Sequence, residues 1–366
     1  MSVKKIFAGI LIFTMILMVG CSSGGGETAD VTEDADTTAD VKENAETTVL
    51  RLAIPDGPDG FMSNAVQEFA DELYERTDGQ YSIEIGWSGA FGSVAEYFDL
   101  VKDGVVDFGF FLPTVTPGVF PLCSIMDLPW YFPDAEISST ALMTLYEEGY
   151  LNDSELEAVQ ILFLNTGDGA NIYSVKENCT TLADFEGQRI VAIGDMMIST
   201  AEALNMSPSF YEHSEHYSVF QKNVMDANFS PWDGIITYNL QEVLNSCLET
   251  KISSSITGLM MNKDVFESMP EEVQQIIYKL SDEVLIPRTL ESRASISEES
   301  RQAFIDAGGT VSEVSDEDLA AMNEALAPLW DSWLEEMGED GKAAVEAMYQ
   351  IMLDQGVENP AVGYTP

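Results

Sequence analysis

The chain carries its two histidines in one short segment, His213-Ser-Glu-His216, with Glu212 and Glu215 beside them. Imidazole and carboxylate groups at this spacing could ligate a metal ion or transfer protons. A metal site needs a further ligand, and no cysteine pair or third histidine at metal-binding spacing supplies one. We therefore expect no metal ion and no cofactor, and we consider His213 as a hydrogen-bonding residue of a binding site.

Catalytic sequence motifs are missing as well. The sequence has no G-x-S-x-G, no phosphate-binding loop, no H-E-x-x-H and no dinucleotide-binding fingerprint. Because it also lacks a paired constellation of catalytic groups, we expect neither hydrolytic nor redox chemistry. The sequence therefore favours a binding protein over an enzyme.

Acidic residues dominate the charge. Of the 366 residues, 63 are Asp or Glu and 16 are Lys or Arg, which gives a formal net charge of −47. We expect no nucleic-acid partner because phosphate binding needs a basic surface. An anionic membrane surface would also repel the chain. The length is sufficient for two domains of ordinary size.

The N-terminus has the features of an exported lipoprotein. Residues 1–20 contain a basic start and an apolar run too short to span a bilayer, as in a signal peptide. The run continues into LMVGCSSGGG, which is similar to a bacterial lipobox with Cys21 as the lipid acceptor. Residues 21–48 are rich in Asp, Glu, Thr and Ala, and we expect them to form a disordered, extended tether. A lipid on Cys21 would anchor the chain at the outer face of the cell membrane.

Three further cysteines, Cys123, Cys179 and Cys247, lie far apart in the sequence. Outside the cell they could form one disulfide and leave one free thiol, or all three could be buried thiols. The sequence leaves both alternatives open.

Strand and helix patterns alternate along residues 49–113. VLRLAIP, YSIEIGW and VVDFGFFLP have strand patterns, and the segments between them carry apolar residues at helical spacing. This alternation predicts an α/β lobe with a largely parallel sheet. Ligands of such lobes bind beyond the C-terminal strand ends, which here carry Pro55–Gly60, Trp87–Gly92 and Phe110–Pro113.

A second alternation follows, with strands at QILFLNTG, NIYSV and RIVAIG. Residues 269–309 then predict a very long helical stretch, which Pro287 should kink or break. Two more helices are predicted in residues 316–338 and 341–356. The sequence therefore predicts two α/β lobes and one unusually long helix.

The order of these segments resembles a known family. VKDGVVDFGF, LPWYF, TTLADFEGQRI, SEHYSVFQKNVMDANFSP and MNKDVFESMPEEVQQII are similar to motifs of the DctP-type extracytoplasmic solute receptors. These receptors deliver small solutes to the membrane subunits of tripartite ATP-independent periplasmic (TRAP) transporters. The resemblance covers roughly Leu50 to Gly341.

The resemblance implies a two-lobe, type II periplasmic-binding-protein-like clamshell with hinge segments and a long interlobe helix. The solute would be enclosed between the two α/β lobes. Lobe I would comprise residues 49–168 and about 256–290. Lobe II, with the C-terminal helices, would comprise residues 169–255 and about 291–358, and residues 359–366 would form a tail.

The resemblance also implies which positions contact the solute. The arginine that clamps carboxylates in family members falls on Val191, and a second arginine falls on Asn171. A polar or acidic contact after the third strand falls on Leu112. The asparagine of an Asn-Pro pair falls on Ser230, and an aromatic residue falls on His213. Both carboxylate-binding arginines are therefore replaced at the matching positions.

This replacement affects the expected ligand. Arg189 shares a strand face with Val191, but its position indicates a solvated cation at the start of the strand. Burying a carboxylate without a cation or several donors is costly. We therefore expect a solute that is neutral, such as a sugar, polyol or aromatic compound, or one that carries a positive group.

Other residues at the strand ends and loops fit such a solute. Aromatic faces suit rings and ammonium groups, and carboxylates accept bonds from hydroxyl or ammonium groups. Trp130, in LPWYF, is expected to be structural instead. The remaining candidates for the binding site are Trp87, Phe110, Phe111, Trp232, Asp195 and Asp233.

Two alternatives stay open. His213 could bind a carboxylate together with backbone donors when it is protonated, below the ordinary imidazole pKa of about 6.5. The chain would then be an organic-acid receptor. A cell-surface sensor could also use the same fold with a different downstream partner, and neighbouring genes for two membrane subunits would distinguish the transporter role from this one.

The Cys21→Ala variant tests the membrane anchor. It should move from the membrane into the soluble exported fraction because the acceptor of the lipid is lost. Cell fractionation followed by immunoblotting measures the change, and Ser22→Ala is the matched control. Equal membrane retention of Cys21→Ala would contradict the lipoprotein prediction.

Overall fold

The computed structural model describes residues 47–366, except 59 and 117. The predicted signal peptide, Cys21 and nearly all of the predicted tether lie outside the described residues. Within the described part, no helix is both long enough and apolar enough to cross a membrane.

The first lobe is built on a five-stranded sheet with the strand order β2-β1-β3-β10-β4. β1 pairs in parallel with β2 and β3, as the alternation predicted, whereas β10 runs antiparallel to both β3 and β4, so the whole sheet is mixed. The strands are β1 (Thr48–Ala53), β2 (Tyr81–Gly86), β3 (Phe108–Phe111), β4 (Val159–Asn165) and β10 (Thr257–Asn262).

Helices α1 (Ser63–Arg76), α2 (Tyr97–Lys102) and α3 (Ala135–Glu147) belong to the first lobe. In α1, the side chains of Val66, Phe69 and Leu73 are fully buried, as their helical spacing predicts. Short 3₁₀ turns follow β2 and β3, at Trp87–Gly89 and Pro113–Val115.

The second lobe is built on a six-stranded sheet with the order β11-β9-β5-β8-β6-β7. Two separate apolar clusters belong to this lobe, one around Ile172 and Phe185 and the other around Tyr173 and Trp232. The strands are β5 (Ala170–Ser174), β6 (Arg189–Val191), β7 (Ser207–Ser209), β8 (Ala227–Ser230), β9 (Ser246–Ile252) and β11 (Thr310–Glu313). The helices are α4 (Asp195–Ala203), α5 (His216–Gln221) and α6 (Asp233–Thr237).

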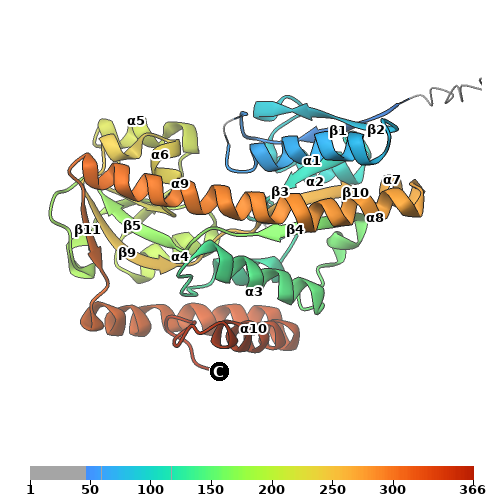
Figure 1. The fold of residues 1–366 in the computed structure, drawn as a ribbon. Helices are drawn as coiled ribbons and strands as arrows, with labels where there is room; N and C mark the ends of the chain where they lie inside the picture. The colour runs from blue at the N-terminus through green and yellow to red at the C-terminus, as the bar shows by residue number, and fades with distance from the viewer. Residues whose placement is uncertain (1–46, 59, 117) are drawn as a thin grey trace, which may run out of the picture. The chain divides into compact units, whose positions relative to one another are not determined.

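One long helical stretch contacts elements of both lobes (Figure 1). After α7 (Lys263–Ser268) come α8 (Glu271–Leu280), a π-helical turn at Ser281–Leu285, and α9 (Ile286–Asp306). The predicted disturbance at Pro287 is therefore a π turn just before the proline, and the chain continues as a helix. α9 packs on α6 of the second lobe and on α1, α3 and β4 of the first.

The C-terminal helix α10 (Asp316–Asp354) contains a break at Gly338, where φ is 63° and ψ is −143°. This break separates the two helices that the sequence predicted. The chain after α10 returns to the first lobe, where Ala361 forms a β-bridge with Trp130. Trp130 is fully buried against Trp330, which agrees with its expected structural role. Cys123, Cys179 and Cys247 are all buried free thiols.

Candidate functional site

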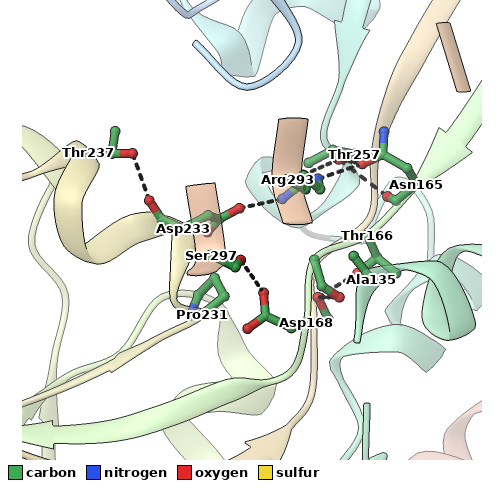
Figure 2. Close-up of polar contacts among 12 residues, drawn as sticks. Ala135, Asn165, Thr166, Asp168, Pro231, Asp233, Thr237, Thr257, Arg293 and Ser297 are labelled. Atoms are coloured by element: carbon green, nitrogen blue, oxygen red, sulfur yellow. Dashed lines mark hydrogen bonds and ion pairs between the residues drawn. The ribbon is translucent and has the colours of Figure 1, made fainter. Parts of the chain in front are cut away.

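The two lobes are joined where the chain leaves β4 for β5 and returns from β9 to β10. Asn165 ends β4 and Thr257 begins β10, so both lie at the first-lobe side of this crossing. α9 passes the same place and directs the side chain of Arg293 into it, as Figure 2 shows. The crossing is therefore the point at which both lobes and the long helix meet.

Arg293 binds residues of both lobes. Its Nε donates to Oδ1 of Asn165 at 2.9 Å, and its Nη2 donates to Oγ1 of Thr257 at 2.8 Å. Its Nη1 pairs with Oδ2 of Asp233, the first residue of α6, at 2.6 Å. The ring of Phe61 covers the guanidinium at 3.8 Å. This arrangement satisfies a buried cation with one carboxylate, two neutral acceptors and an aromatic face.

The same face of α9 makes two further polar contacts, four and eight residues after Arg293. The Ser297 hydroxyl donates to Oδ1 of Asp168 at 3.0 Å, and Arg301 Nε donates to Oε1 of Glu249 at 3.0 Å. Residues at this spacing lie on one side of a helix. The spacing R-x3-S-x3-R therefore forms a polar seam that fixes α9 to the crossing segment and to β9.

Carboxylates outnumber cations around Arg293. Burial lowers the pKa of Arg293, whereas Asp233, Asp168 and Asp56 act in the opposite direction. Burial also raises the pKa of Asp168 to about 6. For Asp56, burial raises the pKa and Arg293 offsets only part of this effect. Oδ2 of Asp56 and Nδ2 of Asn165 are both buried without a hydrogen-bond partner, so the crossing holds an unpaired acceptor and an unpaired donor beside its excess of carboxylates.

The predicted site residues of the first lobe lie close to its core. Phe110 and Phe111 are buried in β3, and Phe110 contacts the edge of Phe61, which in turn covers Arg293. Trp87 and Leu112 are half-buried at the ends of β2 and β3. Phe111 packs on Phe120 in the core. Contact of these residues with a solute remains a prediction.

The predicted residues of the second lobe gather around β5 and β8. Asn171 and Ser230 are paired opposite each other across these strands. Oδ1 of Asn171 accepts the backbone N–H of Lys251 at 3.2 Å. Trp232 is buried, and its Nε1 donates to Glu249 at 3.0 Å.

Val191 is only 1% exposed and belongs to the apolar cluster around Tyr173 and Trp232. Arg189, two residues earlier, is exposed and forms an ion pair with Asp226 at 2.8 Å. As expected, Arg189 is therefore a strand-start cation that its own neighbours neutralise. It does not take over the position of the missing arginine.

His213 reaches solvent and stacks on Tyr238, with ring centroids 5.1 Å apart and 22° between the ring planes. The surrounding protein restricts hydration and lowers the pKa of His213. His216 is buried, and burial together with His213 lowers its pKa to about 4. Asp195 is exposed at the start of α4. Within the described residues, no group of three or more His, Cys, Asp or Glu side chains could hold a metal ion.

Asp233 could be identified from the sequence, but its partner Arg293 was not predicted. Asp56 lay within a strand end expected to face a ligand, but neither it nor Asp168 was singled out. The available signal was the R-x3-S-x3-R spacing in a helix that should contact both lobes. This spacing places the three residues on one helix face, but the other faces of this helix are also rich in polar residues, so the spacing does not by itself predict burial.

Comparisons with known proteins agree with this architecture. The family model of DctP, described as bacterial extracellular solute-binding protein family 7, matches residues 57–336. The C4-dicarboxylate-binding periplasmic protein DctP of Rhodobacter capsulatus is 26% identical over 81% of this chain and 88% of that protein. The ectoine-binding periplasmic protein TeaA of Halomonas elongata is 22% identical over 75% of this chain and 81% of its own.

A solved structure gives the same result for the fold. The crystal structure of a TRAP periplasmic solute-binding protein from Desulfovibrio salexigens superimposes with a TM-score of 0.74 at 22% identity. The match covers 87% of this chain and 98% of the other. The predicted two-lobe α/β fold with a long helix is confirmed.

The Arg293–Asp233 pair yields a stability prediction. Arg293→Met should lower the free energy of unfolding by about 3–5 kcal/mol because it leaves the largely buried carboxylate of Asp233 without its cation. Combining it with Asp233→Asn should cost less than the sum of the two single changes, since the pair is then removed as a unit. Urea unfolding monitored by fluorescence measures all three variants.

Arg288→Met is the matched control, since Arg288 lies on the same helix and pairs with Glu68 at the surface. It should cost less than about 1 kcal/mol. Similar losses for Arg288→Met and Arg293→Met, or strictly additive losses for the pair, would contradict the structural role of the buried guanidinium.

Proposed function

Because the chain belongs to the DctP family of bacterial extracellular solute-binding proteins, we propose that it delivers a captured small solute to a TRAP-type secondary transporter. The solute would bind between the two lobes, near the crossing at which Arg293, Asp233 and Asp56 gather. The family binds solutes and is not enzymatic, in agreement with the missing catalytic motifs. The transporter's membrane subunits are the protein partners of this proposal.

The proposed receptor is lipid-anchored through Cys21 and acts outside the cytoplasm. The lipobox-like LMVGCSSGGG supports the anchor, and the acidic residues 21–48 support a spacer between the membrane and the lobes. Two-dimensional diffusion would keep such a receptor near its transporter, whereas a receptor without an anchor would depend on diffusion through the extracytoplasmic space.

The proposed solute is neutral or carries a positive group. The observation that carries this proposal concerns two residues: Val191, which replaces the clamp arginine, and Arg293, the buried cation at the crossing. Val191 is an aliphatic residue within an apolar cluster, and the buried guanidinium of Arg293 is already paired with Asp233. A solute carboxylate would enter a region with an excess of carboxylates and no free cation among these groups.

The excess of carboxylates over cations also supports a solute that carries hydrogen-bond donors. Asp56 has a buried oxygen without a partner, and Asp233 and Asp168 lie around the same guanidinium. Hydroxyl, ammonium or amidinium groups can donate to such oxygens. The stacked rings of His213 and Tyr238 could contact an apolar or cationic part of the solute.

An organic-acid receptor is the second candidate, since one relative is named for C4-dicarboxylates. Another relative is named for ectoine, so family membership alone does not decide the solute. In this second case, protonated His213 and backbone donors would hold the carboxylate. The lowered pKa of His213 restricts that route to pH values below about 6.5.

A thermal-shift screen at pH 8 tests the proposed solute class. Sugars, polyols, neutral aromatic compounds or amines should raise the melting temperature, whereas mono- and dicarboxylates should not, because only binding to the folded state stabilises it. If carboxylates bind only at lower pH and lose this binding in His213→Ala, the second candidate is correct.

Val191→Arg is the complementary variant in the same screen. It should weaken the solute found with the unmodified protein and create weak carboxylate binding, because a planar guanidinium suits bidentate contact with a carboxylate. Val191→Met, which adds bulk without charge, is the control. Tight carboxylate binding by the unmodified protein at pH 8 would refute the proposed solute class and leave the receptor role intact.

A further inference from the structure

We propose that Asp233 is a specificity-determining residue whose carboxylate occupies Arg293 and thereby excludes carboxylate-bearing solutes. This inference rests on the proposed function, since it explains how the same site would select its solute. It assigns to Asp233 the place that a solute carboxylate would take on an arginine clamp. The chain thus supplies its own carboxylate in place of one from the solute.

Arg293 divides its hydrogen bonds between two neutral acceptors and one acid. Asn165 and Thr257 are neutral acceptors on Nε and Nη2, and Asp233 is the acidic partner on Nη1. Asp56 and Asp168 act on the guanidinium through space, without a hydrogen bond to it in the described part of the chain. Direct neutralisation at the Nη1 edge therefore depends on Asp233.

Solvent reaches Asp233 more readily than it reaches Arg293. The Arg293 side chain is 6% exposed, whereas that of Asp233 is 14% exposed, so the acid is the partner that solvent reaches more readily. Phe61 covers one face of the guanidinium at 3.8 Å, which leaves its edges for polar contacts. A solute carboxylate that bound the Nη1 edge of this cation would have to displace Asp233.

Gly167 lies next to the Arg293–Asp233 pair and contributes no side chain there. A side chain at Gly167 would place its Cβ 3.2 Å from Nη1 of Arg293 and 3.9 Å from Oδ2 of Asp233. Glycine at this position therefore leaves room for the guanidinium and the carboxylate to meet at the crossing. Shortening Asp233 to alanine would vacate a volume about the size of a carboxylate next to Nη1.

Chemical rescue with acetate tests the inference on the full chain. In Asp233→Ala, about 0.1 M sodium acetate should raise the melting temperature by about 2–4 °C over sodium chloride at the same ionic strength, because acetate can replace the lost carboxylate. Acetamide, which has the same shape without charge, should not. The unmodified protein should show no such difference, since Asp233 already occupies the position.

Two variants control for general effects of the anion. Asp306→Ala removes an exposed aspartate at the end of α9 that the site does not include, and it should not respond to acetate. Asp233→Ala combined with Arg293→Met should lose the response, since the cation is gone. If Asp233→Ala does not fold in chloride, its refolding yield in acetate is measured instead, and recovery in acetate alone is the expected result.

An absent acetate response in Asp233→Ala, or an equal response in the unmodified protein, would overturn the inference. So would a refolding yield that acetate does not improve. The acetate measurement does not involve the receptor's own solute, so its failure leaves the proposed receptor function standing. Conversely, a solute screen without hits would count against the receptor function and would not alter the acetate result.

Discussion

The burial of one guanidinium at the crossing between the lobes is the constraint on which the site depends. A buried cation is tolerated only when it is paired and its donors are satisfied. Arg293 meets this condition with partners from the first lobe, Asn165 and Thr257, and from the second lobe, Asp233. The two sheets and the long helix must therefore keep their positions at this point if the charge is to remain neutralised.

The proposed solute class depends on the same constraint. With Arg293 engaged by Asp233 and Val191 within an apolar cluster, a solute carboxylate finds no ready cation in either place. The unpaired groups at the crossing include an acceptor, Oδ2 of Asp56, and a donor, Nδ2 of Asn165. The proposed solute, which donates hydrogen bonds, rests on this arrangement, whereas one relative is named for C4-dicarboxylates.

Much of the fold could be predicted because its signals are local. The alternation of strand and helix patterns from Val49 to Pro113 and the helical spacing in 63–76 follow from residues close in sequence. β9 and β10 were not identified, although each pairs with a strand on both sides in its sheet. Their partners are distant in the chain, and mixed pairing in a sheet leaves no local pattern that distinguishes it from parallel pairing.

The candidate site was harder to predict for the same reason. Arg293 meets Asn165 across 128 positions and Asp233 across 60, so neither contact has a local signature. From the sequence, a single arginine in a long, charged helix is predicted to be exposed to solvent. The family resemblance directed attention to Val191 and to the charge that is missing there, whereas the buried charge on α9 could be recognised only from the folded arrangement.

A crystal structure of the protein with the solute it binds most tightly at pH 8 tests the central claim most directly. The account predicts a solute between the lobes that donates to acidic residues, with Arg293 Nη1 still paired to Asp233. A solute carboxylate seated on Arg293, with Asp233 displaced, would contradict it.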